Sequence, residues 1–355
     1  MTSVILLGAG KIGETIAHLL HRSGDYALTV ADQDPSRLEA AAALGVKTVR
    51  CQFDADDLER LIRGNAMVVS ALPFYLTPGV AAASVKAGAH YFDLTEDVES
   101  TRRVKALAPN ARTVLMPQCG LAPGFISVLS YAMTRKFQTL RDVHMRVGAL
   151  PVYPTNALKY NLTWSTDGLI NEYCNPCEAI IDGGRRETLA LEEMEAFSLD
   201  GIAYEAFNTS GGLGTLCETL EGRVENLNYK TVRYPGHRDL VKMLIRDLRL
   251  GQRREILKDV LEASVPMTRQ DVVLVFVTVS GMQEGRLTQE SFAKKVYAKT
   301  IDERLYSAIQ ITTAAGVCAM VDLVREGVLP DRGFVRQEDA DLERFLANRF
   351  GAHYA

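Results

Sequence analysis

The sequence has little cysteine, little tryptophan and no excess of positive charge. Its 355 residues include six cysteines and one tryptophan, and 40 basic residues stand against 44 acidic ones, for a formal net charge of −4. Without a basic stripe, little would attract nucleic acid or an anionic membrane surface, so we expect small metabolites as partners. Few and scattered cysteines are typical of a reducing compartment rather than of a disulfide framework.

One pair of cysteines, Cys174 and Cys177, has the CxxC spacing of metal and redox sites. No second pair exists, and none of the six histidines lies close to this one in sequence. A structural zinc site needs four ligands. We therefore expect an Asn-Pro turn between buried thiols, and no metal.

The sequence also shows no targeting signal and no obvious membrane span. An apolar run at 4–7 has no basic region or cleavage site before it. The longest weakly polar run, 307–324, is interrupted by Gln310, Thr312 and Asp322, which favours a packed helix. We expect a cytoplasmic, globular chain, long enough at 47% hydrophobic residues for two domains.

The apolar run at 4–7 leads into a glycine motif, Gly8-Ala9-Gly10-Lys11-Ile12-Gly13. Apolar residues then recur with helical period, so the pattern predicts strand, glycine turn and helix. In a dinucleotide-binding fold, Gly8 would permit the tight turn, Gly10 would let the backbone approach a pyrophosphate, and Gly13 would let helix and strand pack closely. The helix N-terminus at Lys11 and Ile12 would stabilise the phosphate charge.

A second apolar run ends at Asp32, 22 residues after Gly10. An acidic side chain at this position accepts hydrogen bonds from the hydroxyls of the adenosine ribose. It would repel a 2′-phosphate, and Gln33 rather than a basic residue follows it, so the pattern favours NAD over NADP. Arg37 lies close enough in sequence to keep NADP open.

Strand-like and helix-like runs alternate as far as residue 116, which predicts a doubly wound parallel sheet of six strands. Ligands of such sheets bind at the carboxyl ends of the strands. Three segments would fall there: 71–75, 93–97 and the irregular CGLAPG segment, 119–124. We expect Ala71, Leu72, Pro73 and Gly120 to lie against the nicotinamide half of the cofactor.

After Gly124 the alternation of strand and helix stops. An alternating run at 143–148, a hairpin turn at 182–184 and a long apolar run at 271–279 predict an α+β substrate domain with a mainly antiparallel sheet. Helices, such as one at 238–250, would cover one side of this sheet. We expect the last long helix, 305–325, to return to the first domain. The expected division is a Rossmann dinucleotide-binding domain, 1–124 with 303–355, and a substrate and dimerisation domain, 125–302.

The segments 69–76, 90–95 and 119–124 resemble the saccharopine dehydrogenase-like family, and 211–216 and 229–237 are similar to its L-lysine 6-dehydrogenase branch. The resemblance implies a homodimeric, NAD-dependent enzyme that oxidises an amine of a basic amino acid. L-lysine would give 2-aminoadipate 6-semialdehyde, with release of ammonia. Members that act on saccharopine tend to carry Asp at the position of Ala122, so that substrate is the alternative.

Oxidation of an amine by hydride transfer requires the neutral amine, because an ammonium has no lone pair to stabilise the developing iminium. A free lysine side chain has a pKa of about 10.4, so the site must remove a proton. Asp93 and Glu96 are the candidate bases, although acidic residues here could instead cap the helix that follows. His237, after a Pro-Gly turn, is the candidate for proton transfer during attack of water, or else a helix-start residue.

Arg233 is the candidate partner of a substrate carboxylate, because a guanidinium binds carboxylates in bidentate geometry. Thr209 and Ser210 could present hydroxyls and amides to the same carboxylate. Cys119 is a candidate wall residue of the substrate site. A rival hypothesis makes Cys119 the thiolate nucleophile of a semialdehyde dehydrogenase, and another makes the chain a nucleotide-binding redox sensor without chemistry.

Overall fold

The chain divides into two units in the computed structural model, which describes residues 1–355. The first unit comprises residues 1–128 and 310–355, and the second comprises residues 129–309. The sequence predicts domain boundaries after residues 124 and 302, a few residues before the observed boundaries after residues 128 and 309. The C-terminal residues thus belong with the N-terminal ones.

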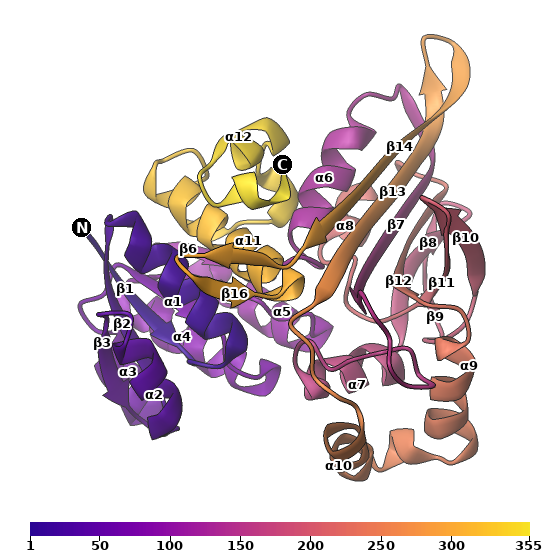
Figure 1. Ribbon diagram of the computed structural model, residues 1–355. Helices are drawn as coiled ribbons and strands as arrows, with labels where there is room; N and C mark the ends of the chain where they lie inside the picture. The colour runs from indigo at the N-terminus through magenta and orange to yellow at the C-terminus, as the bar shows by residue number, and fades with distance from the viewer. The chain divides into compact units, whose positions relative to one another are not determined.

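A seven-stranded parallel sheet forms the centre of the first unit (Figure 1). The strand order is β17-β6-β5-β4-β1-β2-β3, so the direction of winding reverses between β1 and β4, where ligands of such sheets bind. The predicted doubly wound sheet is confirmed, and the C-terminal residues add a seventh strand that the sequence did not predict. The strands are β1 (Thr2–Leu7), β2 (Tyr26–Asp32), β3 (Lys47–Arg50), β4 (Met67–Ser70), β5 (His90–Asp93), β6 (Val114–Met116) and β17 (Gly333–Phe334).

Apolar helix faces close the core of this unit. Ile5 and Val68 of the sheet share one buried cluster with Leu58, Val80 and Val104, which come from three different helices. The helices are α1 (Lys11–Ser23), α2 (Pro35–Ala42), α3 (Ala55–Ile62), α4 (Thr77–Ala87), α5 (Val98–Lys105), α11 (Ala308–Arg325) and α12 (Leu342–Ala347). The helix α6 (Phe125–Thr134) begins in the first unit and ends in the second. The short 3-10 turns are η1 (Phe74–Leu76), η2 (Ala108–Asn110), η5 (Gln337–Asp339) and η6 (Gly351–Tyr354).

The helix α11 is long and apolar enough to cross a membrane by length and composition alone, but 83% of it is buried in the structure. Its Gly316 lies so close to the CGLAPG segment that a Cβ there would be 2.6 Å from the carbonyl oxygen of Gly120. At the other end, the buried carboxylate of Asp322 accepts hydrogen bonds from Tyr26 Oη (2.5 Å) and from Arg325 and Arg349 (2.9 Å each). Burial would raise the pKa of Asp322, but these hydrogen bonds outweigh it and lower the pKa.

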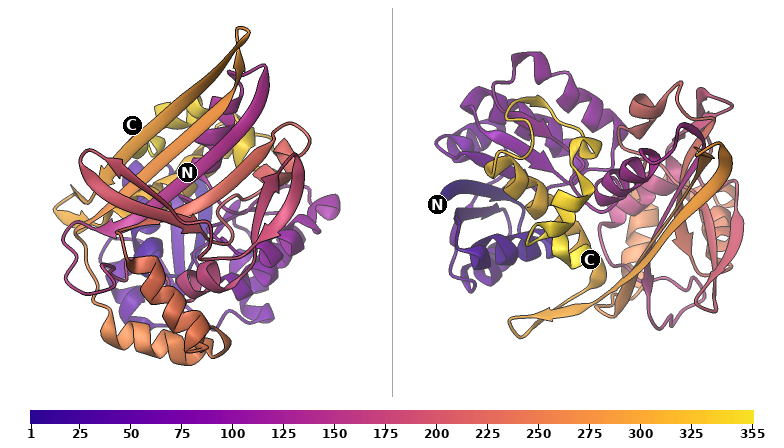
Figure 2. Two further views of the ribbon diagram at one scale, coloured as in Figure 1. Left: turned by 90° about the vertical axis from the view of Figure 1, so that its right-hand side faces the viewer. Right: turned by 90° about the horizontal axis from the view of Figure 1, so that it is seen from above.

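A mixed sheet forms the second unit. Its order is β10-β11-β12-β7-β13-β14, with β8 paired to β12 and β9 to β8; all pairs are antiparallel except β12 with β7. The strands are β7 (Thr139–Pro151), β8 (Cys177–Ile181), β9 (Gly184–Thr188), β10 (Glu195–Leu199), β11 (Ile202–Asn208), β12 (Asn226–Arg233), β13 (Asp271–Gln283) and β14 (Arg286–Tyr297). Figure 2 shows the long strands β7, β13 and β14 side by side. The mainly antiparallel sheet and the hairpin turn at 182–184 are confirmed.

Helices of the second unit pack around a separate apolar core. They are α7 (Thr166–Cys174), α8 (Leu216–Leu220), α9 (His237–Lys242) and α10 (Arg254–Ser264), and a small hairpin of β15 (Lys299–Ile301) and β16 (Arg304–Tyr306) precedes α11. The continuous helix that the sequence predicts at 238–250 is wrong. Instead, α9 passes into a π-helical turn (Met243–Asp247), and a 3-10 turn, η4 (Leu250–Gln252), follows.

We predict that Asp322→Asn destabilises the first unit by about 3 kcal/mol, because it leaves two arginines without their buried carboxylate. Urea unfolding, with hydrogen exchange of β2 and α11 peptides, measures the loss. The folded pKa is lowered, so the stabilisation is present above the unfolded pKa of about 3.9 and the difference between the proteins shrinks as the pH falls below it. Glu59→Gln, which removes an exposed pair with Arg63, is the control and should change nothing measurable. Equal stability of both variants would contradict the prediction.

Candidate functional site

The glycine turn lies at the carboxyl end of β1, beside the reversal of the sheet. Gly8 has a φ of 97°, and a Cβ there would be 2.8 Å from the carbonyl oxygen of Ala71, with Leu72 also in contact. A Cβ at Gly13 would be 2.0 Å from the carbonyl oxygen of Gly8. Only glycine fits these two positions. The turn and the chain after β4 are therefore brought together, as the sequence predicts for Ala71 and Leu72.

Open space lies over the middle glycine of the motif. The nearest atom to a Cβ at Gly10 would be Arg37 Nη1, at 3.9 Å. Gly10 is the N-cap of α1, and Lys11 and Ile12 form its first turn. Backbone with this access, at the N-terminus of a 13-residue helix, fits the pyrophosphate of a dinucleotide.

Asp32 ends β2 and is 3% exposed. Its carboxylate accepts hydrogen bonds from the backbone N–H of Ala9 (2.6 Å) and of Asp34 (2.9 Å). Arg37 lies over this carboxylate, with Nη1 4.0 Å from Asp32 Oδ2 and Nε 3.5 Å from Asp34 Oδ2. At the position expected for the adenosine ribose, the Asp32 carboxylate is suited to bind the ribose hydroxyls. The Arg37 guanidinium beside it is already shared between the carboxylates of Asp32 and Asp34.

Asp93 is the last residue of β5, and its carboxylate is hydrogen-bonded to the backbone of the chain that follows β6. One carboxylate oxygen accepts hydrogen bonds from the backbone N–H of Thr95 and of Gln118 (2.9 Å each), and the other accepts one from Tyr91 Oη (2.6 Å). Burial raises the pKa of Asp93 to about 6, against the lowering effect of these hydrogen bonds. Because both oxygens are occupied, the geometry favours a positioning role for Asp93 over proton abstraction.

Glu96 lies three residues further on and is only partly buried. Its carboxylate forms no hydrogen bond with another side chain, and burial, with the nearby charges of Asp97 and Asp93, raises its pKa to about 7. Asp97 has the helix-capping role, since its side chain accepts a hydrogen bond from the backbone N–H of Ser100 at the start of α5. Of the acidic residues here, Glu96 has the protonation properties of a general base near neutral pH.

The CGLAPG segment reverses the chain between β6 and α6. The Ala122–Pro123 peptide is cis, Gly124 has a φ of 134°, and a Cβ at Gly124 would be 2.0 Å from the carbonyl oxygen of Gly120. Gly120 and Pro73 both follow strands at the carboxyl edge of the sheet. Their contact with the nicotinamide stays a prediction.

Cys119 is 1% exposed, and its sulfur accepts a hydrogen bond from Gln337 Nε2 at 3.3 Å and lies 3.1 Å from the carbonyl oxygen of Met116. Burial raises the pKa of the thiol far above its ordinary value. A neutral, enclosed thiol is a poor nucleophile. The structure therefore argues against the semialdehyde dehydrogenase hypothesis, and nothing in it supports Cys119 as a wall residue of a substrate site.

Arg233 ends β12 and is 2% exposed. Its Nε donates a hydrogen bond to Tyr173 Oη (2.9 Å) and Nη1 donates one to the carbonyl of Val232 (2.8 Å), while the guanidinium carbon lies 4.9 Å from the centre of the Tyr160 ring. The electron-rich faces of two tyrosines thus stabilise the buried cation. A buried guanidinium with further donors suits a carboxylate ligand.

His237 is 1% exposed, with Nδ1 2.8 Å from the carbonyl oxygen of Leu158 and Nε2 3.0 Å from Tyr173 Oη. A carbonyl can only accept, so Nδ1 carries the proton and Nε2 accepts a hydrogen bond from Tyr173. Burial and the charge of Arg233 lower the pKa of His237 to about 3. The expected proton-transfer role is therefore not supported. His237 is a neutral ring that fixes Tyr173, which in turn fixes Arg233.

Thr209 and Ser210 differ in their hydrogen bonding. Ser210 Oγ donates to the carbonyl of Pro176 (2.8 Å) and its N–H to the carbonyl of Glu172 (3.0 Å), so its groups are occupied. Thr209 is 2% exposed and its hydroxyl has no partner. Other buried side-chain oxygens without a partner include those of Tyr160, Asn161 and Thr163, which are close together in sequence; the rest belong to Ser70, Ser127, Ser130 and Gln337. Buried polar atoms in proteins are nearly always hydrogen-bonded, so these oxygens are candidate ligand contacts.

Sequence reasoning missed Tyr160 and Tyr173, which contact both Arg233 and His237. No motif surrounds either tyrosine, and Tyr173 lies 60 residues before Arg233 along the chain. The structure gathers no group of three or more His, Cys, Asp or Glu side chains of the kind that holds a metal ion. Cys174 and Cys177 are free thiols whose pKa is raised by burial.

Comparison with known proteins covers nearly the whole chain. Residues 4–116 match the saccharopine dehydrogenase NADP binding domain, and residues 120–351 match the saccharopine dehydrogenase C-terminal domain. The first match indicates a nicotinamide cofactor in the first unit and leaves the choice between NAD and NADP open.

Two curated relatives share only part of their length with the chain. The mitochondrial α-aminoadipic semialdehyde synthase of Rattus norvegicus is 22% identical over 189 residues, 51% of this chain and 20% of that protein. The quinate/shikimate dehydrogenase (NAD(+)) of Corynebacterium efficiens is 38% identical over 88 residues, 23% of this chain and 31% of that protein. The chain therefore spans no more than about a third of the length of either.

Among solved structures, apo saccharopine dehydrogenase (L-Glu forming) from Saccharomyces cerevisiae superposes with a TM-score of 0.77. It is 17% identical, and the match covers 95% of this chain and 94% of that one. At this identity the likeness establishes the fold. With both of its domains matched, the chain belongs to the saccharopine dehydrogenase family.

Proposed function

We propose that the chain is an NAD-dependent dehydrogenase that oxidises the side-chain amine of a basic amino acid, with L-lysine as the first candidate. Glu96 carries the proposal. Against a lysine ammonium with a pKa of about 10.4, a base whose pKa is about 7 is a better match than an ordinary glutamate at about 4.3. Each pKa unit of mismatch costs about 1.4 kcal/mol, so the raised pKa directly lowers the cost of forming the neutral amine.

Each of these residues has a separate proposed role in the oxidation of the amine. In the first unit, Glu96 accepts the proton of an ammonium group. In the second unit, Arg233, held by Tyr173, binds a carboxylate group, with the Thr209 hydroxyl as a second contact. A nicotinamide dinucleotide held by the glycine turn and Asp32 would supply the hydride acceptor for the carbon that carries the amine. Glu96, now protonated, returns to its carboxylate form by losing that proton to solvent. Water adds to the iminium carbon, its two protons end on the amine nitrogen, and ammonium leaves to give the aldehyde.

A saccharopine-type reaction at a secondary amine is the second candidate. It is favoured by the yeast structure, which is a saccharopine dehydrogenase, and by the rat relative, an α-aminoadipic semialdehyde synthase. Ala122 argues against it, because saccharopine-acting members of the family tend to carry Asp at this position. A screen for NADH formation at alkaline pH with L-lysine, ornithine, diaminopimelate and saccharopine separates the two. Turnover of saccharopine without turnover of lysine would overturn the lysine proposal, and NADH binding without any turnover would support a redox sensor.

The proposed preference for NAD rests on Asp32, with the quinate/shikimate dehydrogenase (NAD(+)) relative in agreement. The proposal also includes a homodimer in the cytoplasm. All six cysteines are free, as in a reducing compartment. The rings of Phe197, Tyr204 and Phe276 pack against one another in tilted contacts, and Phe197 and Phe276 are partly exposed. A second copy of the chain would cover these rings.

We predict a pH profile that depends on Glu96. For the wild type, kcat/KM for lysine should rise with pH through about 7, because the base acts only when deprotonated, and rise again as the substrate ammonium deprotonates. Glu96→Gln should remove the limb near 7 and lower kcat/KM by roughly 100-fold. Glu99→Gln, on the exposed side of the same region, is the matched control. A limb near pH 7 that persists in Glu96→Gln would assign the base elsewhere.

We predict that Asp32→Ser changes cofactor preference. Loss of the carboxylate should lower kcat/KM for NAD by roughly tenfold or more and raise the NADP/NAD ratio of kcat/KM, because a ribose contact is lost and a repulsion of the 2′-phosphate is relieved. The ratio is independent of the fraction of folded protein, and Arg37→Gln should move it in the opposite direction. An unchanged ratio in Asp32→Ser would refute the assignment.

We predict a dimer in sedimentation velocity at micromolar concentration. Phe197→Glu should shift the population to monomer, because it places a charge in the centre of the proposed apolar interface. Leu287→Glu, an exposed apolar residue at the hairpin end of β14, should leave the dimer intact. A wild-type monomer would remove this part of the proposal.

A further inference from the structure

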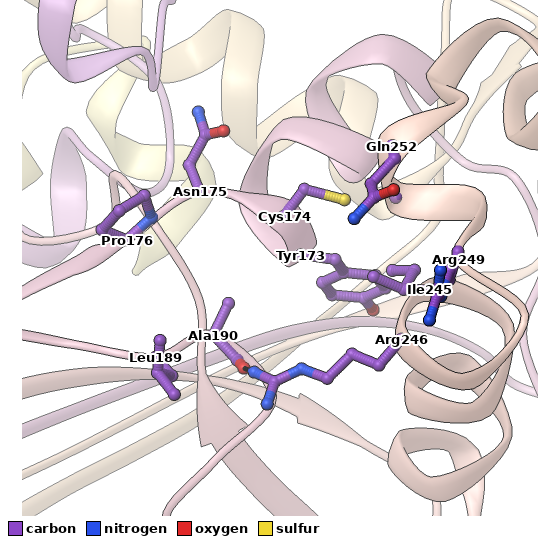
Figure 3. Close-up of a pocket in the computed structure, with 11 residues that line it drawn as sticks. Tyr173, Cys174, Asn175, Pro176, Leu189, Ala190, Ile245, Arg246, Arg249 and Gln252 are labelled. Carbon is purple, nitrogen blue, oxygen red and sulfur yellow. Dashed lines mark hydrogen bonds between the residues drawn. The ribbon is translucent and has the colours of Figure 1, made fainter.

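A pocket of about 430 Å³ lies beside Tyr173 in the second unit, and Figure 3 shows the residues that line it. It is lined by the end of α7, by the residues after β9 and by the segment that follows α9. Its volume falls within the range of about 300–1,000 Å³ that is usual for small-molecule sites. None of the residues assigned above to cofactor, substrate or catalysis lines it; Tyr173, which only positions Arg233, is the one residue in common.

The lining of the pocket is positively charged. Arg246 and Arg249 line it, and no acidic residue does. Arg246 reaches toward Ala190 (Figure 3), whose carbonyl accepts a hydrogen bond from Nη2 (2.7 Å), while Nη1 donates one to Glu192 (2.7 Å). Glu192 is also paired with Lys242 at 2.8 Å, so one carboxylate faces two cations.

Arg249 adds a cation that no carboxylate balances. Both Arg249 and Gln252 are exposed residues of the lining, and neither the guanidinium nor the amide forms an ion pair or hydrogen bond within the protein. Apolar groups, Leu189 and Ile245, line the rest of the pocket. A pocket with unpaired donors, excess positive charge and apolar walls is complementary to an organic anion.

The backbone here departs from a regular helix at the residues that form the pocket. After the π-helical turn (Met243–Asp247), Arg249 has a φ of 56°, a left-handed conformation that is unfavourable for an L-residue with a side chain. Gly251 packs against the wall, where a Cβ would be 2.9 Å from Ile245 Cγ2 and 3.5 Å from Cys174 Sγ. This irregular path brings Arg249 and Gln252 to the pocket, and π-helical turns occur frequently at functional sites.

We propose that this pocket is a separate binding site for a small organic anion that carries a carboxylate. Arg249 and Arg246 bind the carboxylate, and the carbon skeleton packs against Leu189 and Ile245. An occupant also contacts Tyr173, whose hydroxyl holds Arg233 and His237. Occupancy therefore alters the position of Arg233 and, through it, the KM for a carboxylate-bearing substrate; this last step alone rests on the proposed function.

Isothermal titration calorimetry of the full chain with glutarate, adipate and 2-oxoglutarate tests the site. Glutaramide, which has the same skeleton without charge, and inorganic phosphate are the comparison probes. We predict binding of at least one dicarboxylate, weakened roughly tenfold by Arg249→Gln, since loss of one charged hydrogen bond is worth about 1.5 kcal/mol or more. Arg253→Gln, a neighbouring exposed arginine outside the pocket, should bind like the wild type.

Several outcomes would overturn the proposal: no heat with any dicarboxylate, equal affinity in Arg249→Gln, equal affinity for glutaramide, or binding of phosphate alone. Calorimetry measures binding without turnover. It can therefore disprove the anion site while the proposed dehydrogenase activity stands, and it can support the site even if the enzyme does not oxidise lysine. If the enzyme is active with lysine, a saturating dicarboxylate should change KM for lysine in the wild type and not in Arg249→Gln. An unchanged KM in the wild type would refute the link through Tyr173 while leaving the binding result to decide the site.

Discussion

Three strands end in a charged residue that is buried, and each of these charges determines the structure of the loop beside it. Asp32 ends β2, Asp93 ends β5 and Arg233 ends β12, and none is more than 3% exposed. A buried charge is costly unless it is hydrogen-bonded. Asp32 therefore holds the glycine turn, Asp93 holds the chain after β6, and Arg233 holds Tyr173. In each unit, the candidate functional residues consist largely of these charged residues and of the backbone and side chains that bind them.

Three carboxyl groups within five positions of the chain have different roles because their surroundings in the folded protein differ. Asp93 is fully enclosed and bonded through both oxygens, Asp97 caps a helix, and Glu96 keeps a carboxylate without a side-chain partner. In sequence they form one acidic cluster, and each could have been the base. Desolvation and hydrogen bonding, which depend on the folded structure, assign a different role to each.

Local pattern was enough to predict the parallel sheet, the glycine turn, the position of Asp32 and the β8–β9 hairpin, because these depend on neighbouring residues. The structure does not support the reactive roles expected for His237 and Cys119, because both side chains are buried and their pKa values are shifted by burial. Burial cannot be known from a histidine after a turn or a cysteine at a strand end. Tyr173 could not be predicted, since it matters only through contacts with residues far along the chain. The break after α9 was also missed, because the apolar residues of 238–250 keep a helical period across it.

The pairing of β17 with β6 has a consequence for synthesis. Residues 333 and 334 lie beside 114 and 115, so β6 remains an unpaired edge of the sheet until more than 200 further residues have been added. An unpaired parallel edge is a template for association with other chains. During synthesis the first unit is thus an incomplete sheet, and its β6 edge is covered only after β17 has emerged from the ribosome.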